Sequence, residues 1–378
     1  MAIYLDNAAT TPMAPEVVEA MIPILRNDFG NPSSTHSFGR SAKALIETSR
    51  RSISKHLNCQ PSEIIFTSGG TEADNLALYS AVKMGITHII TSCLEHHAIG
   101  HTAEAIAKEF NVRVSLVKVD YNGNVDLDEL EMLLNSEDKT IVSLMHANNE
   151  ISTLLPLKKV SELCQKYNAL FHSDTVQTMG HYAFDLSELK IDFLTCAAHK
   201  FHGPKGIGFL FARNTVKISS LIHGGAQERG FRGGTENIYG IVGLTKAMDL
   251  AYEDVTAHQT HVQALKDYFI SELKAHFDDI EFHGEIDPSK SLYTVLNVSF
   301  PITDKSSMLL FTLDIKGIAC SGGSACTSGA SVGSHVLTGI NADMARPNAR
   351  FSFSRYTTKE EIEFALEQIK AVYATTLA

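Results

Sequence analysis

The sequence is poor in the features that mark secreted and membrane-spanning proteins. It has only six cysteines in 378 residues, and they are scattered along the chain. A small secreted protein held together by disulfides would carry a denser cysteine framework, so the scarcity favours a reducing compartment. No apolar run approaches the roughly 20 residues that a membrane helix requires. Because the first residues also lack the basic and apolar regions of a signal peptide, we predict a soluble, cytoplasmic protein with no membrane partner.

Basic residues are also fewer than acidic residues. Lysine and arginine total 32 against 43 acidic residues, which gives a formal net charge of −11. A surface of that sign repels phosphate backbones and anionic lipids, so no nucleic-acid partner is expected. The 44% of hydrophobic and 20% of charged residues are ordinary for a globular protein. At this length, one large and one small domain are expected.

Short apolar runs alternate with helical patterns between residues 62 and 215. The predicted strands are residues 63–68, 87–92, 112–119, 140–146, 169–174, 192–198 and 206–212. Strands that alternate with helices are typical of a mainly parallel sheet flanked by helices on both faces, so the predicted fold class is α/β. Ligands of such folds bind at the carboxyl ends of the strands, which directs attention to the residues that follow each strand.

The pattern changes after residue 238. The predicted elements are a helix with a break over 238–277, a strand at 294–301, a helix near 306–317 and a strand at 349–355. A last helix begins with a capping box, in which Thr358 is followed three residues later by Glu361. These elements predict a smaller α+β domain. We place the large domain at residues 15–255 and the small domain at residues 1–14 and 256–378.

Weak signals follow the first predicted strands. The glycine turn after the first strand enters a helix through Gly70 and Thr71, which suits a phosphate but equally suits a tight turn capped by Thr71. His96 and His97 follow the next strand, where a surface helix start is the ordinary explanation. Asn149 lies in a run of amides after a strand, and an Asx turn would explain it. Taken one at a time, these residues do not indicate a function.

Two later strand ends carry charged groups. Asp174 closes a strand, with Gln177 three residues further on, and a carboxylate placed there is costly unless it meets a cation. Lys200, beside His199, follows the next strand, and a desolvated lysine can lose its proton and form a Schiff base. A phosphate site, a carboxylate for a ring nitrogen and an amine for an aldehyde are together what pyridoxal 5′-phosphate needs. The histidines and cysteines lack ligand spacing on any one element, so no metal site is expected.

Two of the cysteines, Cys320 and Cys326, lie in CSGGSACTSG at residues 320–329. A run of such small residues cannot pack a core. A metal loop, a disulfide and a mobile nucleophile are therefore all open explanations for its thiols. Glycine would give such a loop the mobility that a nucleophile needs if it must move between two places.

Nearly the whole chain resembles the cysteine desulfurases of the NifS/IscS type, which are class V, fold-type I pyridoxal-phosphate enzymes. The order and spacing of many motifs carry the resemblance. They are YLDNAATTP (4–12), FGNPSSTHSFGR (29–40), FTSGGTEADN (66–75), HANNE (146–150), HSDTVQ (172–177), AHKFHGPKGIG (198–208), GGAQERGFRGGTEN (224–237), GGSACTSG (322–329) and ARFSFSR (349–355).

The resemblance implies a role for each matching residue. Lys200 would hold the cofactor covalently, Asp174 would pair with its pyridine nitrogen, and His96 would stack on its ring and transfer protons. Arg350 would bind the substrate carboxylate, and Cys326 would be the sulfur-accepting nucleophile, in a loop at about residues 320–334. The other implied contacts are those of Gly70, Thr71, His199 and, from a second subunit, Thr235 with the phosphate, and of Asn149 and Gln177 with the phenolic oxygen.

The implied reaction converts L-cysteine to L-alanine and leaves the sulfur on Cys326 as a persulfide. An acceptor protein would then take that sulfur for the biosynthesis of iron–sulfur clusters, thio-cofactors or thiolated tRNA. The role of Thr235 implies a homodimer. One residue departs from the family pattern, since Ala197 stands where a serine usually binds the phosphate. We expect one hydrogen bond fewer to the phosphate there, or a compensating contact.

Two alternatives remain at this point. A selenocysteine lyase or another class V enzyme, such as a transaminase of small amino acids, would use every implied cofactor contact equally well. Cys326 in its glycine- and serine-rich loop favours a desulfurase over a transaminase, which has no use for that thiol. Outside enzymes, the alternative is a non-catalytic carrier of thiols or metals that uses Cys320, Cys326 and the 17 histidines.

Overall fold

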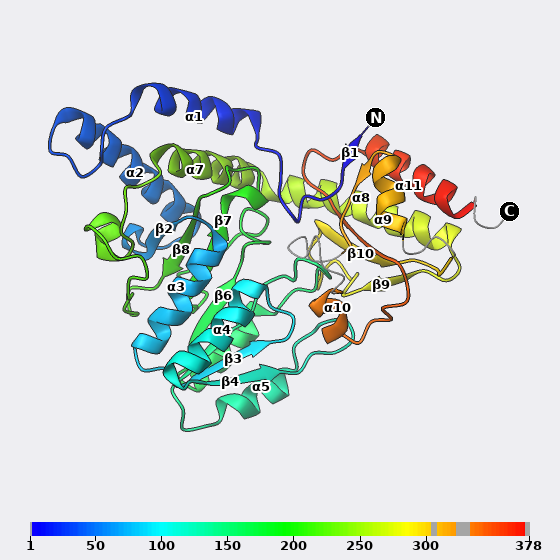
Figure 1. Cartoon of the computed structure of the whole chain (residues 1–378), viewed down its shortest axis with the longest axis horizontal. Coiled ribbons are helices and arrows are strands. Elements are labelled where there is room, and N and C mark those ends of the chain that lie inside the picture. The colour runs from blue at the N-terminus through cyan, green and yellow to red at the C-terminus, as the bar shows by residue number, and fades with distance from the viewer. Residues whose placement is uncertain (1, 304–307, 323–332, 375–378) are drawn as a thin grey trace.

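A seven-stranded sheet forms the centre of the larger part of the molecule (Figure 1). The structure is a computed structural model that describes residues 2–303, 308–322 and 333–374. The strands lie in the order β2-β8-β7-β6-β5-β3-β4. They span Ile64–Thr67 (β2), His88–Ser92 (β3), Arg113–Val117 (β4), Thr140–Ser143 (β5), Leu170–Asp174 (β6), Phe193–Ala197 (β7) and Gly208–Ala212 (β8). Only β8 is antiparallel to its neighbours in this sheet, so β2 runs in the same direction as β3 to β7.

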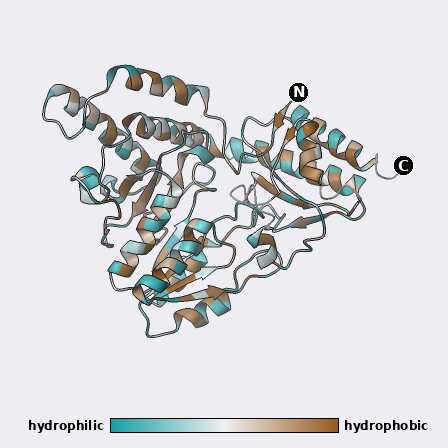
Figure 2. Ribbon diagram, in the orientation of Figure 1, coloured by the Kyte–Doolittle hydropathy of each residue, from teal (hydrophilic) through white to brown (hydrophobic). Residues whose placement is uncertain are grey.

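Helices cover both faces of this sheet because successive residues of each strand point to opposite sides, and both sides are hydrophobic. Ile64 and Ile90 pack in one core with residues of α1, α2, α5, α6 and α7, whereas Ile65 and Ile89 pack in another with α3 and α4. Figure 2 shows the hydrophobic colour concentrated in the strands between these helices. The helices span Pro15–Asn27 (α1), Ser37–His56 (α2), Gly70–Lys83 (α3), His97–Phe110 (α4), Leu127–Leu134 (α5), Leu157–Lys166 (α6) and Ile238–Glu253 (α7).

The second part of the molecule is built on a three-stranded antiparallel sheet in the order β12-β10-β9. A two-stranded parallel pair, β1 with β11, joins the amino-terminal residues to this part (Figure 1). The elements span Ile3–Tyr4 (β1), Val255–His276 (α8), Glu281–His283 (β9), Val295–Ser299 (β10), Leu309–Ile315 (α9), Ile318–Ala319 (β11), His335–Gly339 (α10), Asn348–Ser352 (β12) and Lys359–Ala374 (α11).

The predicted strands are confirmed to within three residues at each end, and β12 begins one residue earlier than predicted. The helix predicted near 306–317 corresponds to α9, and residues 306 and 307 lie outside the described residues. The predicted break in the long helical pattern lies at Asp254, whose side chain accepts a hydrogen bond from Ala257 N and caps α8. The capping box is also present, since Thr358 N donates to Glu361 Oε2 and Glu361 N donates to Thr358 Oγ1. Three short strands, β1, β9 and β11, were not predicted, because two or three residues carry no periodic pattern.

The hydrophobic side chains form separate cores in the two parts. One core contains residues of β10, β12, α8 and α11 together with Ile3 and Leu5 from the amino terminus, and none of these lies in the cores of the large sheet. The predicted division into residues 15–255 and residues 1–14 with 256–378 stays a prediction, which these separate cores support. Within the described ranges, no helix combines the length and the apolar character that crossing a bilayer requires.

Candidate active site

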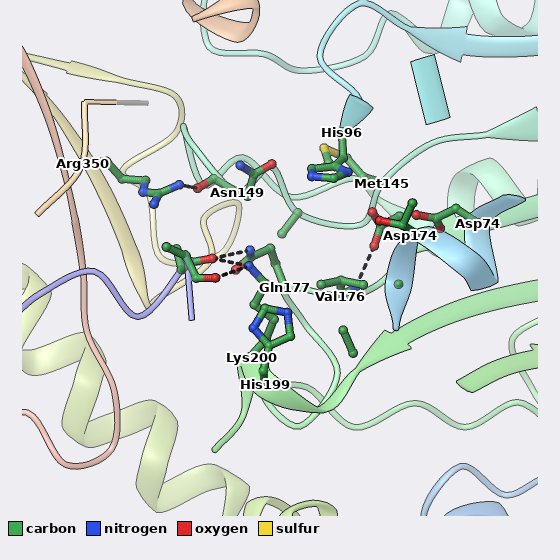
Figure 3. Close-up of a pocket in the computed structure, with 16 residues that line it drawn as sticks. Asp74, His96, Met145, Asn149, Asp174, Val176, Gln177, His199, Lys200 and Arg350 are labelled. Carbon is green, nitrogen blue, oxygen red and sulfur yellow. Dashed lines mark hydrogen bonds between the residues drawn. The ribbon is translucent and has the colours of Figure 1, made fainter. Parts of the chain in front are cut away.

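A cavity of about 270 Å³ lies where five strands of the large sheet end (Figure 3). Strands β2, β3, β5, β6 and β7 run in the same direction, so the residues that follow them converge at one edge. Nine of the predicted site residues line this cavity, and they are Gly70, Thr71, His96, Asn149, Asp174, Gln177, His199, Lys200 and Arg350. The other lining residues are Ala8, Ala9, Asp74, Met145, Ala147, Val176 and Ala197.

Lys200 lies in a short 3-10 helix, Ala198–Lys200, directly after β7. Its Nζ donates hydrogen bonds to the carbonyl oxygens of Ala8, at 2.6 Å, and Ala9, at 2.9 Å. Gln177 Nε2 also donates to Ala8 O, at 3.0 Å. The amino-terminal segment therefore forms one wall of the cavity, and its backbone carbonyls hold the amine in place.

Asp174 ends β6 with only 7% of its surface exposed. Its Oδ1 accepts a hydrogen bond from Val176 N at 2.8 Å, and burial, with the nearby charge of Asp74, raises its pKa. Asp74, which is 1% exposed and lines the same cavity, also has its pKa raised by burial. Two buried carboxyl groups in one cavity favour a cationic N–H partner, because such a partner would stabilise the ionised form.

Asp74 has no ionic partner in the described part of the chain. His172 Nε2 lies 3.5 Å from Asp74 Oδ1, but burial lowers the pKa of His172 to about 4, so this imidazole is neutral near pH 7. No hydrogen bond reaches Asp74 Oδ1 from the residues described. The sequence interpretation did not single out Asp74, because a carboxylate inside a helix is usually solvated.

His96 caps the amino terminus of α4, and its Nδ1 accepts a hydrogen bond from Ala98 N at 3.1 Å. Burial lowers the pKa of His96, an effect that the charge of Asp174 opposes and that of Lys200 reinforces. A neutral imidazole beside Asp174 and Lys200 can accept or pass on a proton. Figure 3 shows its ring next to Met145 at one end of the cavity. His97 is absent from the lining and instead stacks on His101 and contacts His335.

Gly70 and Thr71 form the amino terminus of α3 and line the cavity. A Cβ on Gly70 would lie 2.7 Å from Val176 Cγ2, so the position has no room for a side chain. Backbone N–H groups at a helix amino terminus suit an anion such as a phosphate. Ala197 lines the same cavity, and its methyl group cannot donate the hydrogen bond that a serine there would offer.

Arg350 lies in β12 and is 1% exposed. Its Nη1 donates to Asn149 O at 2.9 Å, a bond drawn in Figure 3. Its Nη2 forms an ion pair with Asp6 Oδ1 at 2.8 Å. Its Nε has no hydrogen-bond partner among the residues described. The second part of the molecule thus supplies a guanidinium group to a cavity otherwise built by the large sheet and the amino-terminal segment.

Two predicted residues are not in this cavity. Thr235 is exposed and lines a separate cavity of about 160 Å³ with Ser68, Gly206 and Arg232. Cys326 lies outside the described residues. The neighbouring Cys320 is described, and burial, with the nearby charge of Asp6, raises the pKa of its thiol to about 12. At neutral pH Cys320 is therefore a thiol and a poor nucleophile.

The side chains that line the cavity fit pyridoxal 5′-phosphate. The helix amino terminus at Gly70 suits its phosphate, and the buried carboxylate of Asp174 suits a protonated ring nitrogen. In the same cavity, Lys200 supplies the amine with which the aldehyde of the cofactor can form a Schiff base. Among the described residues there is no group of three or more histidine, cysteine, aspartate or glutamate side chains that could hold a metal ion.

Comparison with known proteins gives the family that the sequence resembles, and the match extends along nearly the full length of the chain. The family model described as Aminotransferase class-V matches residues 3–364. The cysteine desulfurase IscS of Dictyoglomus turgidum is 42% identical over 375 residues, which cover 98% of this chain and 94% of that protein. The putative cysteine desulfurase IscS 1 of Bacillus subtilis is 41% identical over 376 residues, which cover 98% of this chain and 98% of that protein.

Solved structures show the same fold. A NifS-like protein superposes with a TM-score of 0.91 at 37% identity, over 99% of this chain and 100% of the other. The protein SspA, solved in complex with cysteine, superposes with a TM-score of 0.82 at 30% identity, over 94% of this chain and 99% of that one. The predicted fold class, a mainly parallel sheet flanked by helices with a smaller α+β part, is confirmed.

Proposed function

Because the chain belongs to the class-V aminotransferase family, we infer that it is a pyridoxal-phosphate-dependent cysteine desulfurase, which converts L-cysteine to L-alanine and retains the sulfur. One observation carries this conclusion: the amine of Lys200, the carboxylate of Asp174 and the guanidinium of Arg350 line a single cavity. Relatives named cysteine desulfurase are 42% and 41% identical over nearly the whole chain, and a structural neighbour was solved with cysteine bound.

Bound pyridoxal phosphate supplies an electron sink that weakens bonds to the Cα and Cβ atoms of an amino acid. Asp174 would keep the ring nitrogen protonated, and a cationic ring nitrogen would in turn favour the ionised form of this carboxyl, whose pKa is raised by burial and by the charge of Asp74. His96 would lie against the ring, and Lys200 would provide the covalent attachment. The remaining proposed contacts are Gly70, Thr71 and His199 at the phosphate and Asn149 and Gln177 at the phenolic oxygen, all of which line the cavity.

Arg350 would receive the carboxylate of L-cysteine, since a guanidinium offers paired N–H donors to a carboxylate. The amine of Lys200, once released by the substrate, would take the Cα proton. The Ala8 and Ala9 carbonyls that it contacts stabilise the protonated form. The thiolate of Cys326 would then attack the substrate sulfur, so that an S–S bond forms while the substrate C–S bond breaks. The bonding electrons pass to the substrate carbon, which takes up a proton to give L-alanine.

We also propose that a persulfide on Cys326 passes to an acceptor protein in iron–sulfur cluster, thio-cofactor or tRNA biosynthesis. A cytoplasmic location suits this step, because a reducing compartment keeps the thiol of Cys326 free. Selenocysteine would meet the same contacts as cysteine, so a selenocysteine lyase is the remaining alternative. A transaminase gains no support, because that reaction does not use Cys326.

A homodimer is proposed as the working form. Thr235 would then reach the phosphate in the partner's cavity, which agrees with its exposed place in a separate cavity of its own chain. Large hydrophobic side chains are also exposed near the start of the chain, including Leu25, Phe29 and Phe38. The rings of Phe29 and Phe38 stack on each other, and exposed apolar side chains that gather in this way are typical of an interface. A sedimentation-velocity experiment at micromolar concentration is expected to give a dimer, and a monomer would contradict the proposal.

The function is tested with the purified protein, L-cysteine and a reductant. We expect a yellow protein that forms alanine and sulfide in equal amounts, because each turnover releases one of each. A colourless protein that forms neither product would favour the thiol-carrier alternative. Parallel assays with L-selenocysteine measure the preference, and a kcat/KM at least tenfold higher for selenocysteine would assign the lyase function instead.

A further inference from the structure

Asp6 meets Arg350 at the border of the cavity, although 344 positions separate them in the sequence. Asp6 Oδ1 lies 2.8 Å from Arg350 Nη2, and the guanidinium is almost fully buried. The backbone reinforces the contact, because Asp6 forms a bridge with Ser352 in the strand that carries Arg350. Asn7 Nδ2 donates to Ser352 O at 2.9 Å, and Ala8 N donates to Ser352 Oγ at 2.8 Å.

The contacts of Arg350 leave part of its guanidinium available. A guanidinium has five N–H donors. One Nη1 hydrogen is bonded to Asn149 O and one Nη2 hydrogen to Asp6 Oδ1, so three donors have no hydrogen-bond partner among the described residues. One of them is Nε–H, which is buried and has no partner in the described part of the chain. The other two are on Nη1 and Nη2, one on each, and Arg350 lines the cavity, so these are the donors that a ligand could reach.

We propose that Asp6 is a positioning residue for the substrate. It holds Nη2 of Arg350 from one side while Asn149 holds Nη1, and these two bonds fix the plane of the guanidinium. The remaining hydrogens on the Nη atoms then receive the amino-acid carboxylate. The proposal rests on the proposed function, since it assigns Asp6 to the binding of the same amino-acid substrate.

The simpler explanation is a buried ion pair that only supports the fold. Such a pair would affect all ligands of the cavity alike, because its loss would loosen the segment that places Ala8 and Ala9 in the cavity wall. A positioning role instead affects only ligands that carry a carboxylate. Two ligands that differ in that group alone separate the explanations, and L-alanine and L-alaninamide are such a pair.

The experiment measures the dissociation constants of L-alanine and L-alaninamide from the change in visible absorbance of the holoenzyme. For Asp6→Ala, we expect the constant for L-alanine to rise about tenfold, which corresponds to the loss of one hydrogen bond to a charged group. The constant for L-alaninamide is expected to change less than about twofold. Asp6→Asn is expected to stay near the wild type for both ligands, because its amide oxygen can still accept from Nη2.

The control is Asp279→Ala, which removes another aspartate–arginine pair near the same strand. Asp279 Oδ2 lies 3.0 Å from Arg346 Nη1 outside the cavity, and its side chain is exposed. We expect no change in either constant for this variant. The proposal would be overturned if Asp6→Ala lost affinity equally for L-alanine and L-alaninamide, or if it bound L-alanine as tightly as the wild type or more tightly. The proposed function fails separately, if the wild type forms no alanine and sulfide from L-cysteine.

Discussion

Replacing Lys200 with alanine is expected to lower the turnover of L-cysteine by at least about 10²–10⁴-fold, the contribution of a positioned acid–base group. The variant loses the amine that would hold the cofactor and take the Cα proton. Both tasks need an amine that can change its protonation state. The measurement is the rate of alanine formation together with the mass of the protein after borohydride treatment, which should retain the cofactor in the wild type and lose it in Lys200→Ala.

Lys200→Arg separates this chemistry from a purely electrostatic role. Arginine keeps a positive charge that can donate to the Ala8 and Ala9 carbonyls, but it stays protonated in proteins and cannot act as a base. We expect it to be as inactive as Lys200→Ala. The control is Lys190→Ala, an exposed lysine near the opposite end of β7, which should leave the rate unchanged. Substantial activity in Lys200→Arg would refute the proposed role.

Replacing Cys326 with alanine is expected to reduce sulfide formation to background, a loss of about 10³-fold or more, since no other group can replace a missing nucleophile. The cofactor absorbance should stay unchanged, because no proposed cofactor contact involves this thiol. Sulfide is measured in the presence of a reductant, with the absorbance spectrum recorded on the same sample. Turnover at the wild-type rate in Cys326→Ala would remove the persulfide step from the mechanism.

Cys320→Ala is the matched control for the thiol. Burial and the charge of Asp6 raise the pKa of Cys320 to about 12, so only a trace of thiolate forms below pH 8. We therefore expect Cys320→Ala to form sulfide at close to the wild-type rate. A loss equal to that of Cys326→Ala would mean that the two cysteines act together, as in the disulfide explanation of their motif.

The fold and the residues after each strand could be predicted because they are encoded locally. Hydrophobic runs of four to eight residues predict strands, and parallel strands bring their carboxyl ends to one edge. Asp174 ends β6 and Lys200 follows the neighbouring strand β7, so their meeting in one cavity required no knowledge of distant contacts. The resemblance then implied which group of the cofactor each of these residues would contact.

The rest of the cavity depends on contacts that no local pattern encodes. The carbonyls of Ala8 and Ala9 contact Lys200 through backbone atoms, which have no sequence signature. Asp6 lies next to Arg350 because the amino-terminal residues pair with strands more than 300 residues away: β1 pairs with β11, and Asp6 forms a bridge with Ser352. The motif YLDNAATTP contributed to the resemblance, but its physical role became visible only when the carboxyl-terminal strand was placed beside it.

The segment of residues 6–9, which carries Ala8 and Ala9 of the cavity wall, also has a consequence for the order of folding. Arg350, the partner of Asp6, lies 344 positions later in the chain, and Lys200, the partner of Ala8, lies 192 positions later. Contacts over such distances in the chain close late, because the entropy of a long loop must be overcome first. A nascent chain that has passed residue 255 can form the large sheet but still lacks Arg350. We therefore expect substrate binding to appear only in the last stage of folding, after the parallel sheet has formed.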